Sequence, residues 1–346
     1  MFDKIEQAQL SELHFKHDPA SQFKAIIAIH NSTLGPALGG CRCIHYDSDA
    51  DAISDVIRLA KGMSYKAALA KVPQGGGKAV IIKPHTPFDR SLLYRQFGKF
   101  VHSLGGRYIT AIDSGTQLRD MAEVSQETPH VSGSEIDGID PSPNTAIGVL
   151  AGMKAAALHR YGNSQLKGLT IAIQGIGNVG FQLASRLHNE GARLLVSDID
   201  PEKVQQAQTA FHAEPIEPAQ FYAAHCHILA PCGLGGVINK ETITTLDCDI
   251  IAGSANNQLQ QPEYGEALHR KGILYAPDYV INAGGLIQVS LGHKQASSTE
   301  INNKTWGISD TLTQIFSRSK SENLSPSIIA DQLAEEILYG APLGDL

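Results

Sequence analysis

The 346-residue chain lacks any apolar run of about 18 residues, the length that a membrane-spanning helix requires. Residues 1–18, MFDKIEQAQLSELHFKHD, place acidic residues early and lack the unbroken apolar core of a secretory signal. The five cysteines are an odd number, and without a signal they predict reduced thiols rather than a disulfide framework. These absences exclude membrane-spanning and secreted classes, so we expect a cytoplasmic protein without a membrane partner.

Positive charge is also scarce, since 28 Lys and Arg stand against 35 Asp and Glu and give a net charge of −7. This balance gives no reason to expect nucleic acid or acidic lipid as a partner. The composition, with 42% hydrophobic residues and 33 glycines, is typical of a globular α/β protein. A chain of this length exceeds one typical core, which predicts two domains.

Apolar periodicity predicts alternating strands and helices in the first half of the chain. Residues 24–30 and 41–46 are expected to be strands, separated by a glycine-rich turn over residues 35–40. From Asp51 the apolar residues recur at spacings of three and four, which predicts a helix that extends to Lys66. A strand over residues 79–82, a helix over 89–104 and a strand that ends at Asp113 follow.

Residues 61–83, KGMSYKAALAKVPQGGGKAVIIK, hold the most unusual local chemistry. The glycines at 75–77 predict a tight turn or a close approach of the backbone to a ligand, because glycine loses the most entropy on ordering. Lys78 follows them at the start of an apolar strand, where partial desolvation favours the neutral amine. A neutral lysine can act as a base near neutral pH. The alternative is an ordinary glycine turn followed by a solvated lysine.

Asp113 is a second candidate, because it ends a buried-looking strand and precedes the turn Ser114-Gly115-Thr116. The carboxyl ends of strands in an α/β sheet are a usual place for a working carboxylate. Alternatively, Asp113 caps a helix or builds the turn.

Residues 169–198 predict a complete dinucleotide-binding unit. A strand over 169–174 precedes Gly175-Ile176-Gly177-Asn178-Val179-Gly180, a helix to about residue 189, and a strand from 193 that ends at Ser197-Asp198. We expect Gly175 to make the turn, Gly177 to admit a pyrophosphate to the helix N-terminus, and Gly180 to allow close helix–strand packing. Asp198 is placed to accept hydrogen bonds from an adenosine ribose. Its charge would repel a 2′-phosphate, so NAD is expected rather than NADP.

Three later apolar segments, residues 228–231, 250–257 and 279–285, are predicted to be strands of the same sheet. Asn256 and Asn282 at their ends can hydrogen-bond a nicotinamide carboxamide, a ribose or a substrate carboxylate, or can simply build turns. Turn-rich residues 133–145 mark the expected domain boundary, before a helix from Thr145 to about residue 161. The tail is expected to be helical over about 304–319 and again from Ser325-Pro326.

The segment His225-Cys226-His227, together with Cys232, has side chains of the kind that bind metals. These residues alternate along a predicted strand and therefore point to opposite faces. A second cluster with zinc-like spacing is lacking, so we expect no metal site.

Nine motifs in order resemble the amino-acid dehydrogenase family that includes leucine, valine, phenylalanine and glutamate dehydrogenases. They are GPALGGCR, LAKGMSYKAALA, PQGGGKAVII, YITAIDSGT, PSPNTAIGV, IQGIGNVG, APCGLGGVIN, AGSANNQL and APDYVINAGGLI. The likeness spans roughly residues 24–290 and is nearest to the leucine/phenylalanine/valine branch. It implies an α/β protein with an N-terminal substrate domain over residues 1–141 and a Rossmann NAD-binding domain over 142–310. Helices over about 311–346 are expected to pack back onto the first domain.

The resemblance also implies roles for single residues. Lys66 would grip the substrate α-carboxylate, Lys78 would be the catalytic lysine, and Asp113 would exchange protons with the amino group. Glutamate-specific members carry a lysine where this chain has Leu38, which implies an apolar substrate because a buried carboxylate would stay unpaired here. The other implied substrate contacts are Gly39, Gly40, Ala111, Asn256 and Leu286. The implied NAD contacts are Gly175, Gly177, Asn178, Val179, Gly180, Asp198, Thr145, Asn256 and Asn282.

The implied reaction is NAD-dependent oxidative deamination of an apolar L-amino acid, first of all leucine or another branched-chain residue, by a homo-oligomer. One alternative is a phenylalanine- or tryptophan-preferring enzyme. Another is a catalytically silent paralogue that binds NAD or amino acids as a sensor. A sensor would need carboxylate binding but not a base, so the combination of Lys66, Lys78 and Asp113 argues against it. Ile112, Ser114 and the residues after Val289 depart from the family pattern.

Overall fold

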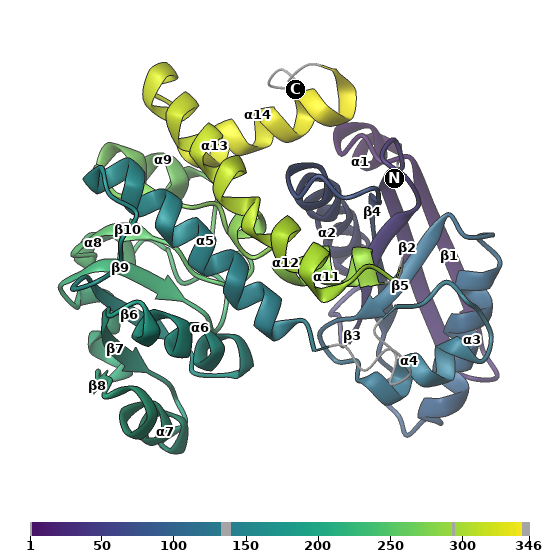
Figure 1. Cartoon of the computed structure of the whole chain (residues 1–346). Coiled ribbons are helices and arrows are strands. Elements are labelled where there is room, and N and C mark those ends of the chain that lie inside the picture. The colour runs from purple at the N-terminus through teal and green to yellow at the C-terminus, as the bar shows by residue number, and fades with distance from the viewer. Residues whose placement is uncertain (1, 133–139, 293–294, 341–346) are drawn as a thin grey trace. The chain divides into compact units, whose positions relative to one another are not determined.

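The computed structural model describes residues 2–132, 140–292 and 295–340 (Figure 1). The chain divides into two compact units, one of Met1–Ile139 with Ala334–Leu346 and one of Asp140–Leu333. Each unit combines helices with one β-sheet, which confirms the predicted α/β class with two domains. Within the described ranges, none of the helices is both long and apolar enough to span a membrane.

The first unit contains a five-stranded mixed sheet with the strand order β1-β2-β4-β3-β5. Strand β2 pairs antiparallel with β1 and β4, whereas β3 lies parallel to β4 and β5. The elements are α1 (Phe2–Gln7), β1 (Glu12–Asp18), β2 (Phe23–Asn31), β3 (Ala37–Ile44), α2 (Asp49–Leu69), β4 (Gly75–Ile82), α3 (Arg90–His102), β5 (Tyr108–Ile112), α4 (Leu118–Ser125) and the end of α14 (Pro326–Tyr339).

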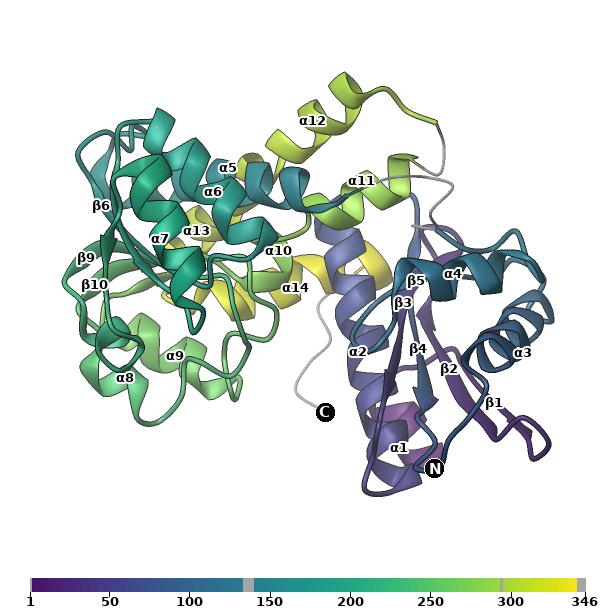
Figure 2. The same cartoon turned by 90° about the horizontal axis from the view of Figure 1, so that it is seen from below.

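Helices cover both faces of this sheet, as Figure 2 shows for α2 on one side and α3 with α4 on the other. Ile26 and Val80 pack with Val56 of α2 in one buried cluster. Ile27 packs with Phe97 of α3 in the other. Because successive side chains of a strand point to opposite faces, the position of a residue along β3, β4 or β5 decides which helix it meets.

Of the two interpretations of the glycines before Lys78, the tight turn is wrong. Gly75–Gly77 are the first residues of β4, where Gly75 and Gly76 pair with β3 and Gly77 pairs with β2. A Cβ on Gly76 would lie 2.0 Å from the backbone nitrogen of Ser64, and one on Gly75 would lie 2.1 Å from the carbonyl oxygen of Asn31. The glycines therefore let β4 approach the backbone of its neighbours. The predicted turn over residues 35–40 is also too long, since β3 already begins at Ala37.

The second unit contains a six-stranded parallel sheet with the strand order β11-β10-β9-β6-β7-β8. Its elements are α5 (Ser142–Tyr161), β6 (Thr170–Gln174), α6 (Asn178–Asn189), β7 (Arg193–Ser197), α7 (Pro201–Phe211), β8 (Glu214–Pro215), a 3-10 helix (Pro218–Ala223), β9 (Cys226–Pro231), α8 (Thr242–Thr245), β10 (Cys248–Ile251), α9 (Glu263–Arg270), β11 (Leu274–Tyr275), α10 (Asp278–Ile281), α11 (Gly284–Gly292), α12 (Ser298–Trp306), α13 (Ile308–Glu322) and the start of α14.

The strand order confirms the Rossmann-like arrangement of this unit. The chain runs outward from β6 through β7 to β8 and then returns to β9 on the other side of β6. The order therefore reverses between β6 and β9, and ligands of such sheets bind at the carboxyl ends of the strands at this point. The glycine-rich sequence directly follows β6 at that position.

Two predictions in the C-terminal part of the chain are wrong. Residues 279–285 form no strand, because α10 begins at Asp278 and β11 ends at Tyr275. A short apolar run does not distinguish a buried strand from a buried helix turn. The helix expected from residue 304 is two helices that meet at Gly307, and the first starts at a capping box of Ser297 with Glu300. The predicted start at Ser325-Pro326 is confirmed. Residues 133–139 of the predicted boundary segment lie outside the described residues.

Candidate active site

The candidate catalytic residues of the first unit share the sheet face that α2 covers. Val80 of β4 packs against α2, so Lys78, two residues earlier, points to the same side. Gly40 of β3 lies opposite Ala111 of β5, and Asp113 comes two residues after Ala111. Adjacent strands in register thus place a lysine and a carboxylate on one face.

Lys78 and Asp113 form an ion pair, with 2.7 Å between Lys78 Nζ and Asp113 Oδ2. Lys78 is only 7% exposed, so little solvent screens the pair. Burial raises the pKa of Asp113, but the charge and hydrogen bond of Lys78, the Ser114 backbone N–H and the charge of Arg42 outweigh it. The net result is a pKa below the usual value, which keeps the carboxylate ionised next to the lysine.

The turn after β5 fixes the carboxylate. The Thr116 hydroxyl accepts a hydrogen bond from the Asp113 backbone N–H and donates one to the Asp113 carbonyl, both at 2.8 Å. Gly115 has a φ of +80°, and a Cβ there would lie 1.9 Å from the Cys43 carbonyl oxygen. A Cβ on Gly40 would lie 2.8 Å from the Asp113 Cβ. Glycine at these two positions therefore allows the carboxylate to lie against β3.

Arg42 is a residue of this site that the sequence reasoning missed. Its Nη1 donates to Asp55 Oδ2 at 2.7 Å, and its Nε lies 3.5 Å from Asp113 Oδ2. Asp113 therefore has two cations beside it, Lys78 and Arg42. The signal was present in the sequence, because Arg42 follows Gly40 by two positions and must share its face of β3.

Lys66 lies in the last turn of α2, on the helix that covers this face. Gly76 of β4 lies against Ser64 of α2. Lys78 follows Gly76 by two residues, and Lys66 follows Ser64 by two residues. Ser64 in turn contacts the buried His30, with 2.8 Å between Ser64 Oγ and His30 Nδ1. Burial, helped by the charge of Lys61, lowers the pKa of His30 to about 4, so this imidazole is neutral at neutral pH.

Three of the residues expected to contact the substrate lie on the same sheet face as the ion pair. Leu38, which is 3% exposed, lies opposite Gly76 of β4 and Ile109 of β5, on the same face as Gly40 and Lys78. Ala111 is half-buried on that face. Gly39 points to the other face, and a Cβ there would lie 1.7 Å from the Gly77 carbonyl oxygen. The structure thus brings Leu38, Gly40 and Ala111 together with the ion pair but turns Gly39 away.

The glycine-rich turn in the second unit has the geometry of a dinucleotide site. Gly175 has a φ of +88°, and a Cβ on Gly180 would lie 1.9 Å from the Gly175 carbonyl oxygen. Around Gly177, by contrast, a Cβ would meet no described atom within 4 Å. Gly177 is the N-cap of α6, and no side-chain hydrogen bond caps this helix. The first turn of α6, with Asn178 and Val179, can therefore receive a phosphate group.

Asp198 follows β7 beside this turn. Its Oδ2 accepts a hydrogen bond from the Ile176 backbone N–H at 2.6 Å, and its Oδ1 accepts one from the Asp200 backbone N–H at 2.9 Å. Each carboxylate oxygen retains a further acceptor position. The oriented carboxylate therefore fits the hydroxyl groups of an adenosine ribose.

Asn256 and Asn282 are brought together by the second unit. Asn282 Nδ2 donates to Asn256 Oδ1 at 2.7 Å and to the Ser254 carbonyl oxygen at 3.1 Å. Asn282 is 5% exposed, and its buried Oδ1 has no hydrogen-bond partner among the described residues. A buried amide oxygen without a donor is rare, and the N–H of a nicotinamide carboxamide would satisfy it.

Two further predicted contacts lie at neighbouring helix starts. Thr145, in the first turn of α5, donates through its hydroxyl to the Pro141 carbonyl oxygen at 2.9 Å. A Cβ on Gly285 would lie 2.9 Å from that hydroxyl oxygen, so α11 approaches α5 closely there. Leu286, the next residue of α11, is half-buried.

His225, directly before β9, and His227, within it, have other partners. His227 Nδ1 accepts a hydrogen bond from the Thr170 backbone N–H at 3.0 Å, and His225 Nδ1 lies 3.0 Å from Asp247 Oδ2. Across residues 2–132, 140–292 and 295–340, no three His, Cys, Asp or Glu side chains are grouped as metal ligands.

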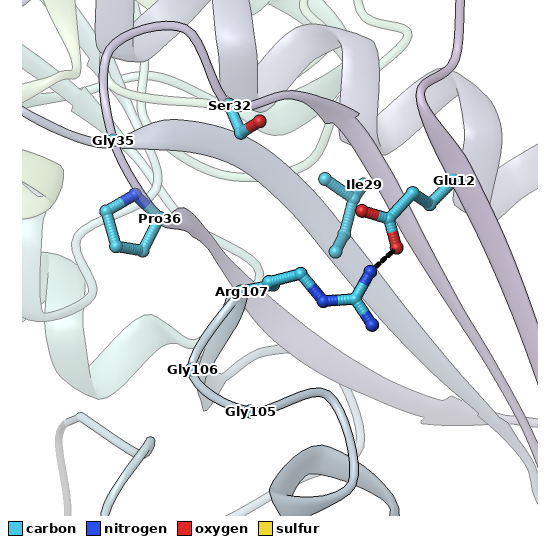
Figure 3. A pocket seen from close by; sticks show the side chains of 8 residues that line it. All are labelled: Glu12, Ile29, Ser32, Gly35, Pro36, Gly105, Gly106 and Arg107. Atoms are coloured by element: carbon cyan, nitrogen blue, oxygen red, sulfur yellow. Dashed lines mark hydrogen bonds and ion pairs between the residues drawn. The ribbon is translucent and has the colours of Figure 1, made fainter.

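A cavity of about 280 Å³ lies elsewhere in the first unit (Figure 3). It opens where β3 and β5 begin, whereas Asp113 follows the end of β5. Glu12 and Arg107 face each other across it as an ion pair. The lining residues are Glu12, Ile29, Ser32, Gly35, Pro36, Gly105, Gly106 and Arg107. None of the predicted site residues is among them, and its two charged groups already neutralise each other.

Comparison with known proteins identifies relatives along nearly the whole chain. Residues 8–130 match the family described as Glu/Leu/Phe/Val dehydrogenase, dimerisation domain, and residues 196–325 match Glutamate/Leucine/Phenylalanine/Valine dehydrogenase. The leucine dehydrogenase of Geobacillus stearothermophilus is 44% identical over 97% of this chain and 92% of its own length. The phenylalanine dehydrogenase of Caldalkalibacillus thermarum is 42% identical over 97% of this chain and 93% of its own length.

A solved structure is similar along its whole length as well. The crystal structure of L-tryptophan dehydrogenase from Nostoc punctiforme superimposes with a TM-score of 0.89 at 41% identity, covering 98% of this chain and 99% of that one. The matches cover both units and both candidate sites. This chain therefore belongs to the glutamate/leucine/phenylalanine/valine dehydrogenase family, whose members act on the CH–NH2 group of amino acids with a nicotinamide cofactor.

Proposed function

We propose that this enzyme oxidatively deaminates an apolar L-amino acid, with leucine or another branched-chain amino acid as the preferred substrate and NAD as the cofactor. One amino acid, one NAD and one water give the 2-oxo acid, ammonium, NADH and a proton. The observation that carries this proposal is the buried ion pair of Lys78 and Asp113 on a sheet face that also holds Leu38.

Each residue of the first unit has a distinct task in this reaction. Lys66 pairs with the substrate carboxylate, and Asp113 accepts a proton from the substrate ammonium group. A nicotinamide held by the second unit would supply the hydride acceptor, and loss of the hydride from its α-carbon converts the substrate into an iminium. Lys78 then takes a proton from the water that adds to this iminium. A cation, a carboxylate and a tunable amine match these three demands.

Glycines and amides of the second unit would hold the cofactor. Gly177 and the first turn of α6 would receive the pyrophosphate, and Asp198 would bind the adenosine ribose. Asn282 would accept a hydrogen bond from the nicotinamide carboxamide through its buried Oδ1. Thr145, Asn178, Val179 and Asn256 would complete the contacts.

We expect NAD to exceed NADP in kcat/KM by at least roughly tenfold, since like charges about 4 Å apart near a protein surface repel by about 4 kcal/mol. Asp198→Ser should narrow this ratio, because it removes the charge that meets a 2′-phosphate. Asp200→Ser is the matched control: it removes a charge two residues away and keeps a residue type that caps α7. Steady-state kinetics with both cofactors would contradict the assignment if the wild-type enzyme used them equally well.

Leu38→Lys is expected to raise the ratio of glutamate to leucine kcat/KM by at least about tenfold, the change that about 1.4 kcal/mol of pairing gives. A lysine there would offer the glutamate side chain a partner that Leu38 cannot provide. Leu38→Met conserves volume without charge and should leave the ratio unchanged. An equal shift of the ratio in both variants would show that packing at position 38, not charge, governs the choice.

An aromatic amino acid is the second candidate substrate. The L-tryptophan dehydrogenase of Nostoc punctiforme is 43% identical over 97% of this chain, close to the 44% of the leucine dehydrogenase. Comparing kcat/KM for leucine, phenylalanine and tryptophan decides between the two classes of substrate.

We further propose that the enzyme is a cytoplasmic homo-oligomer. The match to a dimerisation domain supports the oligomer.

A further inference from the structure

An arginine at the start of α3 lies where its charge is unfavourable. Arg90 is the first residue of this helix, directly after the N-cap Asp89, whose side chain accepts the Leu92 backbone N–H at 3.0 Å. The N-terminus of a helix carries partial positive charge, so a cation in the first turn is destabilised there. The placement requires compensating contacts.

Those contacts begin with a buried carboxylate on α4. Arg90 donates through Nε to Asp120 Oδ1 at 2.7 Å and through Nη2 to Asp120 Oδ2 at 2.6 Å. Asp120 is only 2% exposed, and it also accepts the Gln117 backbone N–H at the start of α4. The guanidinium carbon lies 5.1 Å from the ring centre of Tyr94. A bidentate, partly buried pair of this kind fixes the guanidinium in one orientation.

The oriented guanidinium reaches the turn that carries Asp113. Arg90 Nη2 donates to the Gly115 carbonyl oxygen at 3.0 Å. From the other side, β3 holds the same turn, because the Cys43 backbone N–H donates to the Ser114 carbonyl at 2.9 Å. Hydrogen bonds from Arg90 and from β3 therefore both hold the turn of residues 113–116 in place.

We propose that Arg90, oriented by Asp120, is a positioning residue that sets the Asp113 carboxylate against Lys78. The inference rests on the proposed catalytic role of Asp113. Without Arg90 the Gly115 carbonyl loses a charged donor, so the turn relaxes and the 2.7 Å separation of the Asp113 and Lys78 charges is no longer fixed.

The same helix offers a matched control. Arg95 also lies on α3 and also bridges to α4, with 2.7 Å between its Nε and Glu123 Oε2. Its side chain is 47% exposed, and its ion pair within the described residues is with Glu123 rather than with the turn of Asp113. Substitution of either arginine removes an ion pair between α3 and α4. Only substitution of Arg90 also removes the hydrogen bond to the Gly115 carbonyl oxygen.

The test compares Arg90→Gln, Arg90→Lys, Arg95→Gln and Asp113→Asn in the full-length enzyme. The measurements are kcat and KM for leucine, KM for NAD, NADH binding by fluorescence and Tm. Arg90→Gln is expected to lower kcat roughly ten- to hundredfold, the cost usual for a misplaced reacting group, while NADH binding stays unchanged. Arg90→Lys should fall between wild type and Arg90→Gln, because an ammonium cannot make the fork to Asp120 and reach Gly115 together. Arg95→Gln should retain the wild-type kcat.

Equal kcat values for Arg90→Gln and Arg95→Gln would overturn the proposal, whether or not Tm falls in both variants. A wild-type kcat in Asp113→Asn would show instead that the proposed role of Asp113 is wrong, and the positioning role would fall with it. NADH binding gives the concentration of intact cofactor sites in the second unit, and Tm shows whether the first unit, which holds Arg90, is still folded at the assay temperature.

Discussion

Lys78→Ala is expected to lower kcat for leucine by roughly two to four orders of magnitude, the range usual for a general acid–base group. Lys78 is the buried amine that pairs with Asp113 and, in the proposed reaction, takes a proton from water. NADH binding should change little, because the residues proposed to bind the cofactor belong to the other unit. Steady-state kinetics together with NADH fluorescence titration measure both quantities.

Two further variants test whether Lys78 acts as a base or only provides a positive charge. Lys78→Arg keeps the cation but cannot lose a proton near neutral pH, so it should be nearly as inactive as Lys78→Ala. Lys83→Ala removes a lysine just beyond the end of β4 and should leave kcat unchanged. High activity in Lys78→Arg would mean that this position provides only positive charge, and the proposed proton transfer would be wrong.

Asp113→Asn is expected to produce a loss of similar size, roughly two to four orders of magnitude in kcat. The amide has the same shape but cannot accept the ammonium proton. It also removes the anion between Lys78 and Arg42, which leaves two cations facing each other in a partly buried site. We therefore expect KM for leucine to rise as well, because the substrate ammonium group would approach two unneutralised charges.

Asp55→Asn is the matched control for this charge. Asp55 also pairs with Arg42, at 2.7 Å, but it has no ion pair with Lys78 among the described contacts. Its removal should cost stability, measured as Tm, with a much smaller loss of kcat than Asp113→Asn. Equal losses of kcat in the two variants would mean that the orientation of Arg42, rather than the Asp113 carboxylate, limits the reaction.

The cofactor unit could be predicted from the sequence because its signals are local. Strands β6 and β7, helix α6 and the terminal Asp198 all lie within about twenty residues of the glycine-rich turn and follow the expected order. The required conformation of Gly175 and the close packing at Gly180 are properties of the turn itself. Short-range sequence patterns are sufficient where both ends of a motif are close along the chain.

The catalytic face depends on contacts between distant segments, and there the prediction was incomplete. The glycines at 75–77 indicated a tight turn or a close approach of the backbone to a ligand, but they are strand residues whose missing Cβ atoms allow the backbones of Ser64 and Asn31 to come close. Arg42 contacts Asp113 from about 70 residues away in the sequence, and Arg90 contacts the turn after Asp113 from about 25 residues away. The apolar run at 279–285, predicted to be a strand, lies in the end of α10 and the start of α11, because periodicity cannot decide between helix and strand over so few residues.

The most direct test of the central claim is a screen of the twenty amino acids with NAD, followed by NADH absorbance. The proposed function predicts that leucine, isoleucine or valine gives the highest kcat/KM, and that ammonia and the matching 2-oxo acid form in equal amounts with NADH. Glutamate should be a far poorer substrate, because its side-chain carboxylate would have to be desolvated beside Leu38. Glutamate as the best substrate, or no NADH formed with any apolar amino acid, would contradict the account.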